Sequence, residues 1–202
     1  MSAKNIINLQ KAVSEMRKYQ RQMELTLASI HADTNFALDH EASDKKNEQF
    51  WRRTIIRCLL AYIEALLWNL KQLIQPIALI SNTQFTIADL EIIQEEKTVS
   101  IKGKIEIRRN HLKFRDNLKA TFSLFGKAHG ISFKINCNHD FDALCKIYDL
   151  RSRLMHPKKP FDLNVSDSDF AASKQGVAWL GQEYTRLMDA CEPAMLQITK
   201  DK

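Results

Sequence analysis

Residues 50–76 read FWRRTIIRCLLAYIEALLWNLKQLIQP, and this stretch decides the fold. Its apolar side chains recur mostly at three- and four-residue intervals, which is the spacing of one face of an α-helix. They are Phe50, Ile56, Leu59, Ile63, Leu66, Leu67, Leu70 and Ile74. Because Pro76 has no backbone N–H and clashes with the preceding turn, we expect it to kink or end this helix. The helix is predicted to form the centre of the core.

The same stretch is too short and too polar to cross a membrane. Its most apolar part, Cys58 to Leu70, is about 13 residues long and contains Glu64 and Asn69, whereas a span needs ~20 apolar residues. The first residues carry no apolar run of signal-peptide length. The cysteines at positions 58, 137, 145 and 191 have no Cys-x-x-Cys spacing. We therefore expect a cytoplasmic protein with reduced thiols and no membrane partner.

Length and composition predict a single helical domain spanning residues 1–202. The 202 residues are 45% apolar and include only 5 Gly and 4 Pro, so turn signals are scarce. Val99, Ile101, Ile105 and Ile107 alternate about Lys102-Gly103, which predicts a small β-hairpin near residues 98–108. The expected fold class is all-α, an up-and-down bundle of about five helices with this hairpin inserted.

Capping residues and breaks in the apolar pattern set the expected bounds of the other helices. The first helix is expected over about 2–30, and the polar stretch 33–47 should interrupt the pattern. A short helix is expected within 86–96, and a further one beginning near Phe114 should end at Gly126 or Gly130. The next helix should begin after Asn138 as N-cap and stop near His156, because Pro157 disfavours helical geometry before it. Ser166 or Asp167 should cap the last helix.

The net charge of +6 is concentrated in one segment. Between Lys97 and Lys119 there are eight basic residues (Lys97, Lys102, Lys104, Arg108, Arg109, Lys113, Arg115 and Lys119) and two acidic ones, Glu106 and Asp116. Such a segment attracts phosphates and makes RNA an expected partner. The alternative is an ordinary solvated face.

Arg151 occupies an unusual position in the helix that follows Asn138. On a helical wheel, Leu144, Ile147, Tyr148, Leu154 and Met155 fall within roughly 60 degrees of it. An arginine in such an apolar stripe needs a partner, because an unpaired buried charge costs several kcal/mol. The position predicts either a buried ion pair or a cleft lined by this helix. Arg153 lies on the opposite side of the wheel and is expected to be solvated.

Glu64 and His156 each allow two interpretations. Glu64 is either part of a charged flank of its helix or the partner of Arg151 across the bundle. His156 is either a capping group at a helix end or a group that transfers protons, since its ordinary pKa near 6.5 suits neutral pH.

The run Tyr148-Asp-Leu-Arg-Ser-Arg-Leu-Met-His-Pro157 resembles the Arg-x4-His signature of the HEPN superfamily. The stretch Ala61-Tyr-Ile-Glu-Ala-Leu-Leu67 resembles the acidic, alanine-containing core helix of many members. The resemblance covers about Gln49 to Cys191, and only the run from Arg151 to Pro157 is specific. Members are helical bundles, frequently dimers, and many are metal-independent endoribonucleases whose motif residues from two subunits share one cleft, while others have lost catalysis.

The resemblance implies roles for named residues. His156 would be the acid or base and Arg151 would hold the phosphate, while Ser152 takes a polar position where asparagine, aspartate or histidine is more usual. Arg153, Lys158 and Lys159 are the expected substrate-binding cations, and Glu64 the supporting residue. No cofactor is expected. A metal site is not expected either, because Cys137-Asn-His139 lacks a second pair at ligand spacing.

Two functions from different classes remain at this point. The first is a HEPN-type endoribonuclease that cleaves RNA by attack of the 2'-hydroxyl, as a toxin or defence component restrained by an antitoxin or regulatory protein. The second is a non-catalytic helical module that dimerises and binds a protein or a nucleotide. Both imply a homodimer.

Overall fold

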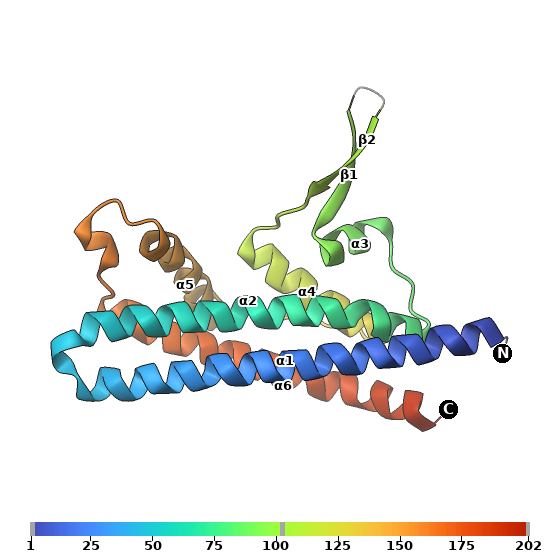
Figure 1. The fold of residues 1–202 in the computed structure, drawn as a ribbon, viewed down its shortest axis with the longest axis horizontal. Helices are drawn as coiled ribbons and strands as arrows, with labels where there is room; N and C mark the ends of the chain where they lie inside the picture. Colours follow the sequence, from blue (N-terminus) through green and yellow to red (C-terminus); the bar gives the residue numbers. More distant parts are fainter. Residues whose placement is uncertain (1–2, 102–103, 201–202) are drawn as a thin grey trace. The chain divides into compact units, whose positions relative to one another are not determined.

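We describe the chain by a computed structural model of residues 3–101 and 104–200 (Figure 1). These residues form six α-helices, two 3-10 helices and one antiparallel strand pair. The α-helices are α1 (Ala3–Ser43), α2 (Glu48–Ser81), α3 (Ile87–Gln94), α4 (Phe114–Ala128), α5 (His139–Met155) and α6 (Asp167–Lys200). The 3-10 helices are η1 (Lys45–Asn47) and η2 (Pro160–Leu163), and the strands are β1 (Glu96–Ile101) and β2 (Lys104–Arg109). The predicted fold class, an all-α helical bundle with a small β-hairpin, is confirmed.

The chain divides into two compact units. The described residues of 1–22, 67–135 and 186–202 form unit 1, and residues 23–66 and 136–185 form unit 2. Helices α1, α2 and α6 are each divided between the units, with one segment of the helix in unit 1 and the other in unit 2. The expectation of a single domain over 1–202 stays a prediction.

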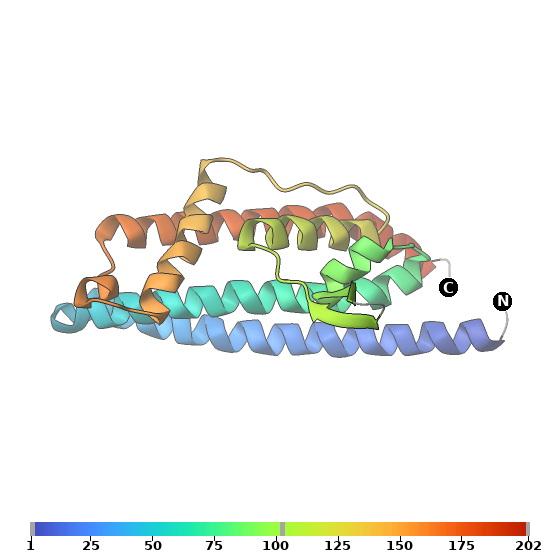
Figure 2. The same ribbon diagram turned by 90° about the horizontal axis from the view of Figure 1, so that it is seen from above.

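The core of unit 2 is made by one face each of α2, α5 and α6. The buried apolar side chains are Ile55, Ile56, Leu60, Ile63 and Leu66 on α2, Phe141, Leu144, Ile147, Leu150 and Leu154 on α5, and Phe170, Trp179 and Leu180 on α6. Full burial of such a side chain contributes roughly 1.5–3 kcal/mol. Within this unit α5 runs across the direction of α2 and α6 rather than alongside them (Figure 2).

Gly176 allows α5 and α6 to approach closely at their crossing. A Cβ atom at this position would lie 2.5 Å from the backbone nitrogen of Leu144 and 2.6 Å from its Cα. Real Cβ atoms essentially never come within 3.0 Å of such atoms. The absence of a side chain at Gly176 is therefore what permits this contact between α5 and α6.

The core of unit 1 joins α2 and α6 to α4. Its buried side chains include Leu70, Leu73 and Ile74 on α2, Leu118, Phe122 and Phe125 on α4, and Leu187 and Cys191 on α6. Burial raises the pKa of the Cys191 thiol to about 11. None of the four cysteines, all of which lie within the described residues, forms a disulfide.

Helix α4 ends at Ala128, in agreement with one of its two expected stops. Gly130 has a φ of +77°, in the left-handed region that favours glycine after a helix, while Gly126 lies inside the helix. His129 caps the helix and is buried, with Nδ1 2.9 Å from the carbonyl oxygen of Phe125. This burial lowers the pKa of His129, because the charged imidazolium is disfavoured away from water.

The hairpin is two residues longer at its start than expected and ends one residue later. Strands β1 and β2 pair antiparallel from Glu96 opposite Arg109 to Ile101 opposite Lys104. The expected turn residues Lys102 and Gly103 lie outside the described residues.

The expected end of the first helix is wrong. Helix α1 continues to Ser43, through the polar stretch that should have interrupted it. Two small side chains in that stretch, Thr34 and Ala37, are buried, so the helix has a contact face that large apolar residues do not mark. The helix ends before Asp44, whose side chain accepts hydrogen bonds from the backbone of Asn47 and from Trp51 Nε1.

Of the two expected effects of Pro76, a kink or an end of the helix, the second is wrong, because α2 passes through Pro76 and ends at Ser81. A proline inside a helix costs about 3 kcal/mol. Ile74, Ile77 and Ala78 are buried on either side of Pro76, and their burial offsets that cost. The helix stops at Asn82, which has a φ of 58°.

The two glycines inside α6 should respond oppositely to substitution. We expect Gly176→Ala to lower the free energy of unfolding by roughly 1–3 kcal/mol or more, because the new Cβ collides with the backbone of Leu144. Gly181→Ala, which meets no atom within 4 Å, should instead raise it by about 0.5–1 kcal/mol. Urea denaturation of both variants tests this, and equal effects would contradict the close crossing.

Candidate functional site at the end of α5

Helix α5 begins and ends as expected from its flanking residues. The side chain of Asn138 accepts hydrogen bonds from the backbone of Asp140 and Phe141, both at 3.1 Å, and forms the N-cap. Two acidic residues, Asp140 and Asp142, occupy the first turn, where the helix dipole favours negative charge. His156 is the C-cap. The expected position of Arg151 within the apolar stripe needs correction, however.

Arg151 lies at the edge of the buried face and not in its middle. The buried side chains nearest in sequence are Leu150 and Leu154, while Met155 is exposed. Leu144, Ile147 and Leu154 of the expected stripe are buried, so the buried face overlaps that stripe and is shifted toward Leu150. The side chain of Arg151 keeps 39% of its accessible surface and is reached by solvent.

Arg151 pairs with Glu64, which is the second of the two interpretations of Glu64. Its Nη2 lies 3.0 Å from Glu64 Oε1. The hydroxyl of Tyr148 donates to the same carboxylate oxygen at 3.3 Å. The guanidinium also lies 5.3 Å from the centre of the Tyr148 ring. One carboxylate from α2 and one ring from α5 thus orient the guanidinium while leaving it accessible.

His156 and Ser152 lie in the last turn and are exposed. The backbone N–H of His156 donates to the carbonyl oxygen of Ser152 at 3.1 Å. His156 follows Met155, the last helical residue, and its φ of −130° and ψ of 57° lie outside helical geometry. The position of His156 therefore does not follow the regular helical spacing from Arg151.

Arg153 is not solvated as expected. Its Nη2 lies 3.0 Å from Asp169 Oδ2, and its side chain keeps 29% of its surface. Asp169 also accepts from the backbone of Ser166, whose hydroxyl caps α6 by accepting from the backbone of Asp169. Arg153 therefore ties the end of α5 to the start of α6, while Lys158 and Lys159 are exposed.

The loop after His156 is held in place by the carboxylate of one of its own residues, Asp162. Asp162 Oδ2 accepts from the backbone N–H groups of Lys158 at 2.8 Å and Lys159 at 2.9 Å. Arg53 on α2 donates to the carbonyl of Leu163 at 3.2 Å. These bonds fix the path of the chain that carries Lys158 and Lys159.

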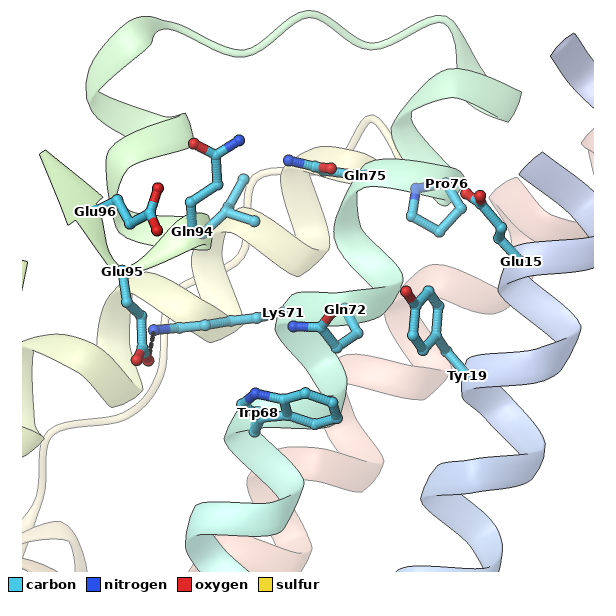
Figure 3. Close-up of a pocket in the computed structure, with 11 residues that line it drawn as sticks. Glu15, Tyr19, Trp68, Lys71, Gln72, Gln75, Pro76, Gln94, Glu95 and Glu96 are labelled. Atoms are coloured by element: carbon cyan, nitrogen blue, oxygen red, sulfur yellow. Dashed lines mark hydrogen bonds and ion pairs between the residues drawn. The ribbon is translucent and has the colours of Figure 1, made fainter. Parts of the chain in front are cut away.

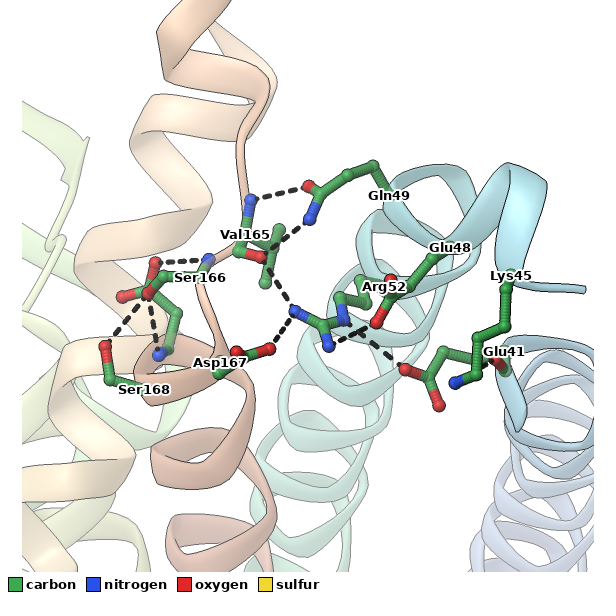
Figure 4. A network of polar contacts seen from close by, with 10 residues as sticks. Glu41, Lys45, Glu48, Gln49, Arg52, Val165, Ser166, Asp167 and Ser168 are labelled. Atoms are coloured by element: carbon green, nitrogen blue, oxygen red, sulfur yellow. Dashed lines mark hydrogen bonds and ion pairs between the residues drawn. The ribbon is translucent and has the colours of Figure 1, made fainter.

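Further along, Arg52 anchors the segment that leads into α6 (Figure 4). Its guanidinium donates to the carbonyl of Val165 at 3.3 Å and pairs with Asp167, Glu41 and Glu48. Partial burial disfavours the charged guanidinium, but the hydrogen bonds to Asp167 and Glu41 outweigh it, so the pKa of Arg52 lies above its ordinary value. Gln49 makes two further bonds to Val165, at 3.0 and 2.9 Å.

Arg57 is a residue of this region that sequence reasoning did not single out. It lies between Arg53 and Glu64 on one side of α2, at spacings of four and seven residues. Both neighbours on that side contact α5 or the loop after it, through Leu163 and Arg151. Arg57 is exposed, and no described residue pairs with it. The signal in the sequence that could have identified Arg57 is its seven-residue spacing from Glu64, which places both residues on one side of the helix.

No group of three or more His, Cys, Asp or Glu side chains within 3–101 and 104–200 is placed to hold a metal ion. In the same ranges no helix combines the length and the apolar character that crossing a bilayer requires. No protein-family model, curated protein or solved structure matches the chain.

The pairing of Arg151 with Glu64 should contribute little to stability. Both side chains keep substantial surface, 39% and 44%, so water screens their attraction. In a double-mutant cycle with Arg151→Met and Glu64→Gln, we expect a coupling free energy of about 0.2–1 kcal/mol. Chemical denaturation of the four proteins measures it. A coupling above roughly 3 kcal/mol would show that the pair is a buried structural contact and not an accessible one.

Proposed function

We propose that the protein is a metal-independent endoribonuclease of the HEPN type. The observation that carries the proposal is the state of Arg151, which is oriented by Glu64 and Tyr148 yet remains accessible five residues before an exposed His156. A guanidinium held in this way is already oriented to contact phosphate oxygens, and it cannot lose its proton. The exposed imidazole of His156 is accessible to RNA as an acid or a base.

The proposed reaction needs only these side chains and the RNA itself. His156 removes the proton of the ribose 2'-hydroxyl and, as the imidazolium, donates it to the leaving 5'-oxygen. The 2'-oxygen forms a bond to phosphorus as the bond to the 5'-oxygen breaks, and Arg151 stabilises the negative charge on the remaining phosphate oxygens. The products are a 2',3'-cyclic phosphate and a 5'-hydroxyl. Ser152 lines the site, and Lys158, Lys159 and Arg57 bind the flanking phosphates.

The proposed active form is a homodimer. Because motif residues from two subunits share one cleft in the superfamily that the motif resembles, we place Arg151 of one copy beside His156 of a second. A two-fold axis would then create two equivalent clefts. The exposed cations of the hairpin, Lys97, Arg108 and Arg109, offer RNA a further phosphate-binding surface. A toxin or defence role, with an antitoxin or regulatory protein as partner, belongs to the same proposal.

A non-catalytic dimerisation module is the second candidate. The ion pair itself favours it, since the charge of Arg151 is already opposed by Glu64. Ser152 points the same way, because active relatives more usually carry asparagine, aspartate or histidine at that position. The two functions differ in whether RNA is cleaved, and not in the fold.

Mutation of the two motif residues should separate activity from stability. His156→Ala should fold normally and lose about two to four orders of magnitude in cleavage rate, because the exposed ring supports little packing. Arg151→Lys should keep the fold and lose most activity, because lysine cannot make two parallel bonds to a phosphate. Single-turnover cleavage of labelled RNA in EDTA, with end-group identification of the products, measures both.

His139→Ala is the matched control, since His139 is an exposed histidine at the other end of the same helix. It should cleave at the wild-type rate. Cleavage that EDTA abolishes, or full activity of purified His156→Ala, would overturn the proposed mechanism and favour the dimerisation module.

A further inference from the structure

Unit 1 contains a cavity of about 450 Å³, and none of its lining residues belongs to the candidate site at the end of α5. It lies between α1, α2 and the end of α3 with the start of β1, and Figure 3 shows its lining. Its volume falls in the range of roughly 300–1,000 Å³ that is typical of small-molecule sites. The lining is unusual in combining two aromatic rings, three glutamine amides and three carboxylates.

A buried ion pair forms one wall of the cavity. Lys71 keeps only 3% of its side-chain surface, and its Nζ lies 2.8 Å from Glu95 Oε1. Glu95 is the C-cap of α3 and has a φ of 55°, in the left-handed region. A charge as deeply buried as that of Lys71 requires this partner, so the pair neutralises one carboxylate and leaves no free positive charge for a ligand.

The remaining charge of the lining is negative. Glu15 and Glu96 add two carboxylates, and Lys71 is the one cation among the described lining residues. Lys11 pairs with Glu15 from outside the lining, at 4.0 Å and with both side chains exposed, and water screens this contact. The lining therefore carries a net charge of −2 on a chain whose net charge is +6.

Two aromatic rings face this negative charge. Trp68 on α2 lines the cavity and remains 47% exposed, and Tyr19 lines it from α1. Tryptophan provides the strongest aromatic face for an organic cation, and tyrosine the next. The amides of Gln72, Gln75 and Gln94 supply oxygen acceptors for N–H donors. Figure 3 shows Trp68, Tyr19 and Gln72 along one side of the lining.

Charge decides between the two ligand classes that rings and amides can recognise. A nucleotide would stack on Trp68, but its phosphates would meet a lining with a net charge of −2. An organic amine satisfies the carboxylates, the amides and the rings together. We propose that this cavity binds an aliphatic diamine or polyamine, with its ammonium groups on Glu15 and Glu96 and its methylene chain along Trp68.

Isothermal titration of the full-length protein with spermidine tests this proposal, with AMP as the anionic aromatic probe. Spermidine should bind, and more weakly as the NaCl concentration rises. The double variant Glu15→Gln/Glu96→Gln should bind about tenfold more weakly or worse, and Trp68→Leu should also lose affinity. These substitutions leave the Lys71–Glu95 pair in place, and circular dichroism checks the fold. Asp189→Asn, which removes an exposed carboxylate outside the cavity, should bind like the wild type.

Three results would overturn the proposal. They are no measurable binding of spermidine at millimolar concentration, tighter binding of AMP than of spermidine, and unchanged spermidine affinity in the folded double variant. None of these results bears on RNA cleavage, because no motif residue lines the cavity.

Discussion

The candidate site in unit 2 depends on one close contact between helices. At Gly176, the backbone of α6 comes so near to Leu144 of α5 that no side chain fits between them. This contact, with the burial of Leu144, Ile147 and Leu154, fixes how α5 crosses α6. The direction of α5 in turn brings Arg151 to Glu64 on α2 and sets where His156 ends the helix.

The polar contacts around this crossing differ in what they do. Arg52 is largely buried and joins three carboxylates and the carbonyl of Val165, so it holds structure together. Arg153 does the same on a smaller scale through Asp169. The pair of Arg151 with Glu64 is the more open one, and at such exposure an ion pair orients its partners more than it stabilises the fold. Of these three arginines, Arg151 keeps the most side-chain surface accessible to solvent.

Local signals in the sequence predicted both ends of α5 and the start of α6, because a cap is decided by a few neighbouring residues. Asn138, His156 and Ser166 cap their helices as expected. Features set by distant contacts were missed. Burial of Thr34 and Ala37 extends α1, and apolar packing on both sides of Pro76 carries α2 past it. The helical wheel predicted more burial for Arg151, and more exposure to solvent for Arg153, than the structure shows. For Arg153 the reason is that its partner, Asp169, lies outside α5. The role of Gly176 could not be predicted from the sequence, because it depends on α5 crossing α6 at that residue.

The central claim is that Arg151 and His156 act together on RNA across two copies of the chain. The most direct test mixes two inactive variants, Arg151→Lys and His156→Ala, under conditions that let subunits exchange. Random exchange places half of the dimers in mixed form, and each mixed dimer restores one intact cleft of two, so about a quarter of wild-type cleavage should return. A mixture that exchanges subunits and stays as inactive as its components would contradict the claim.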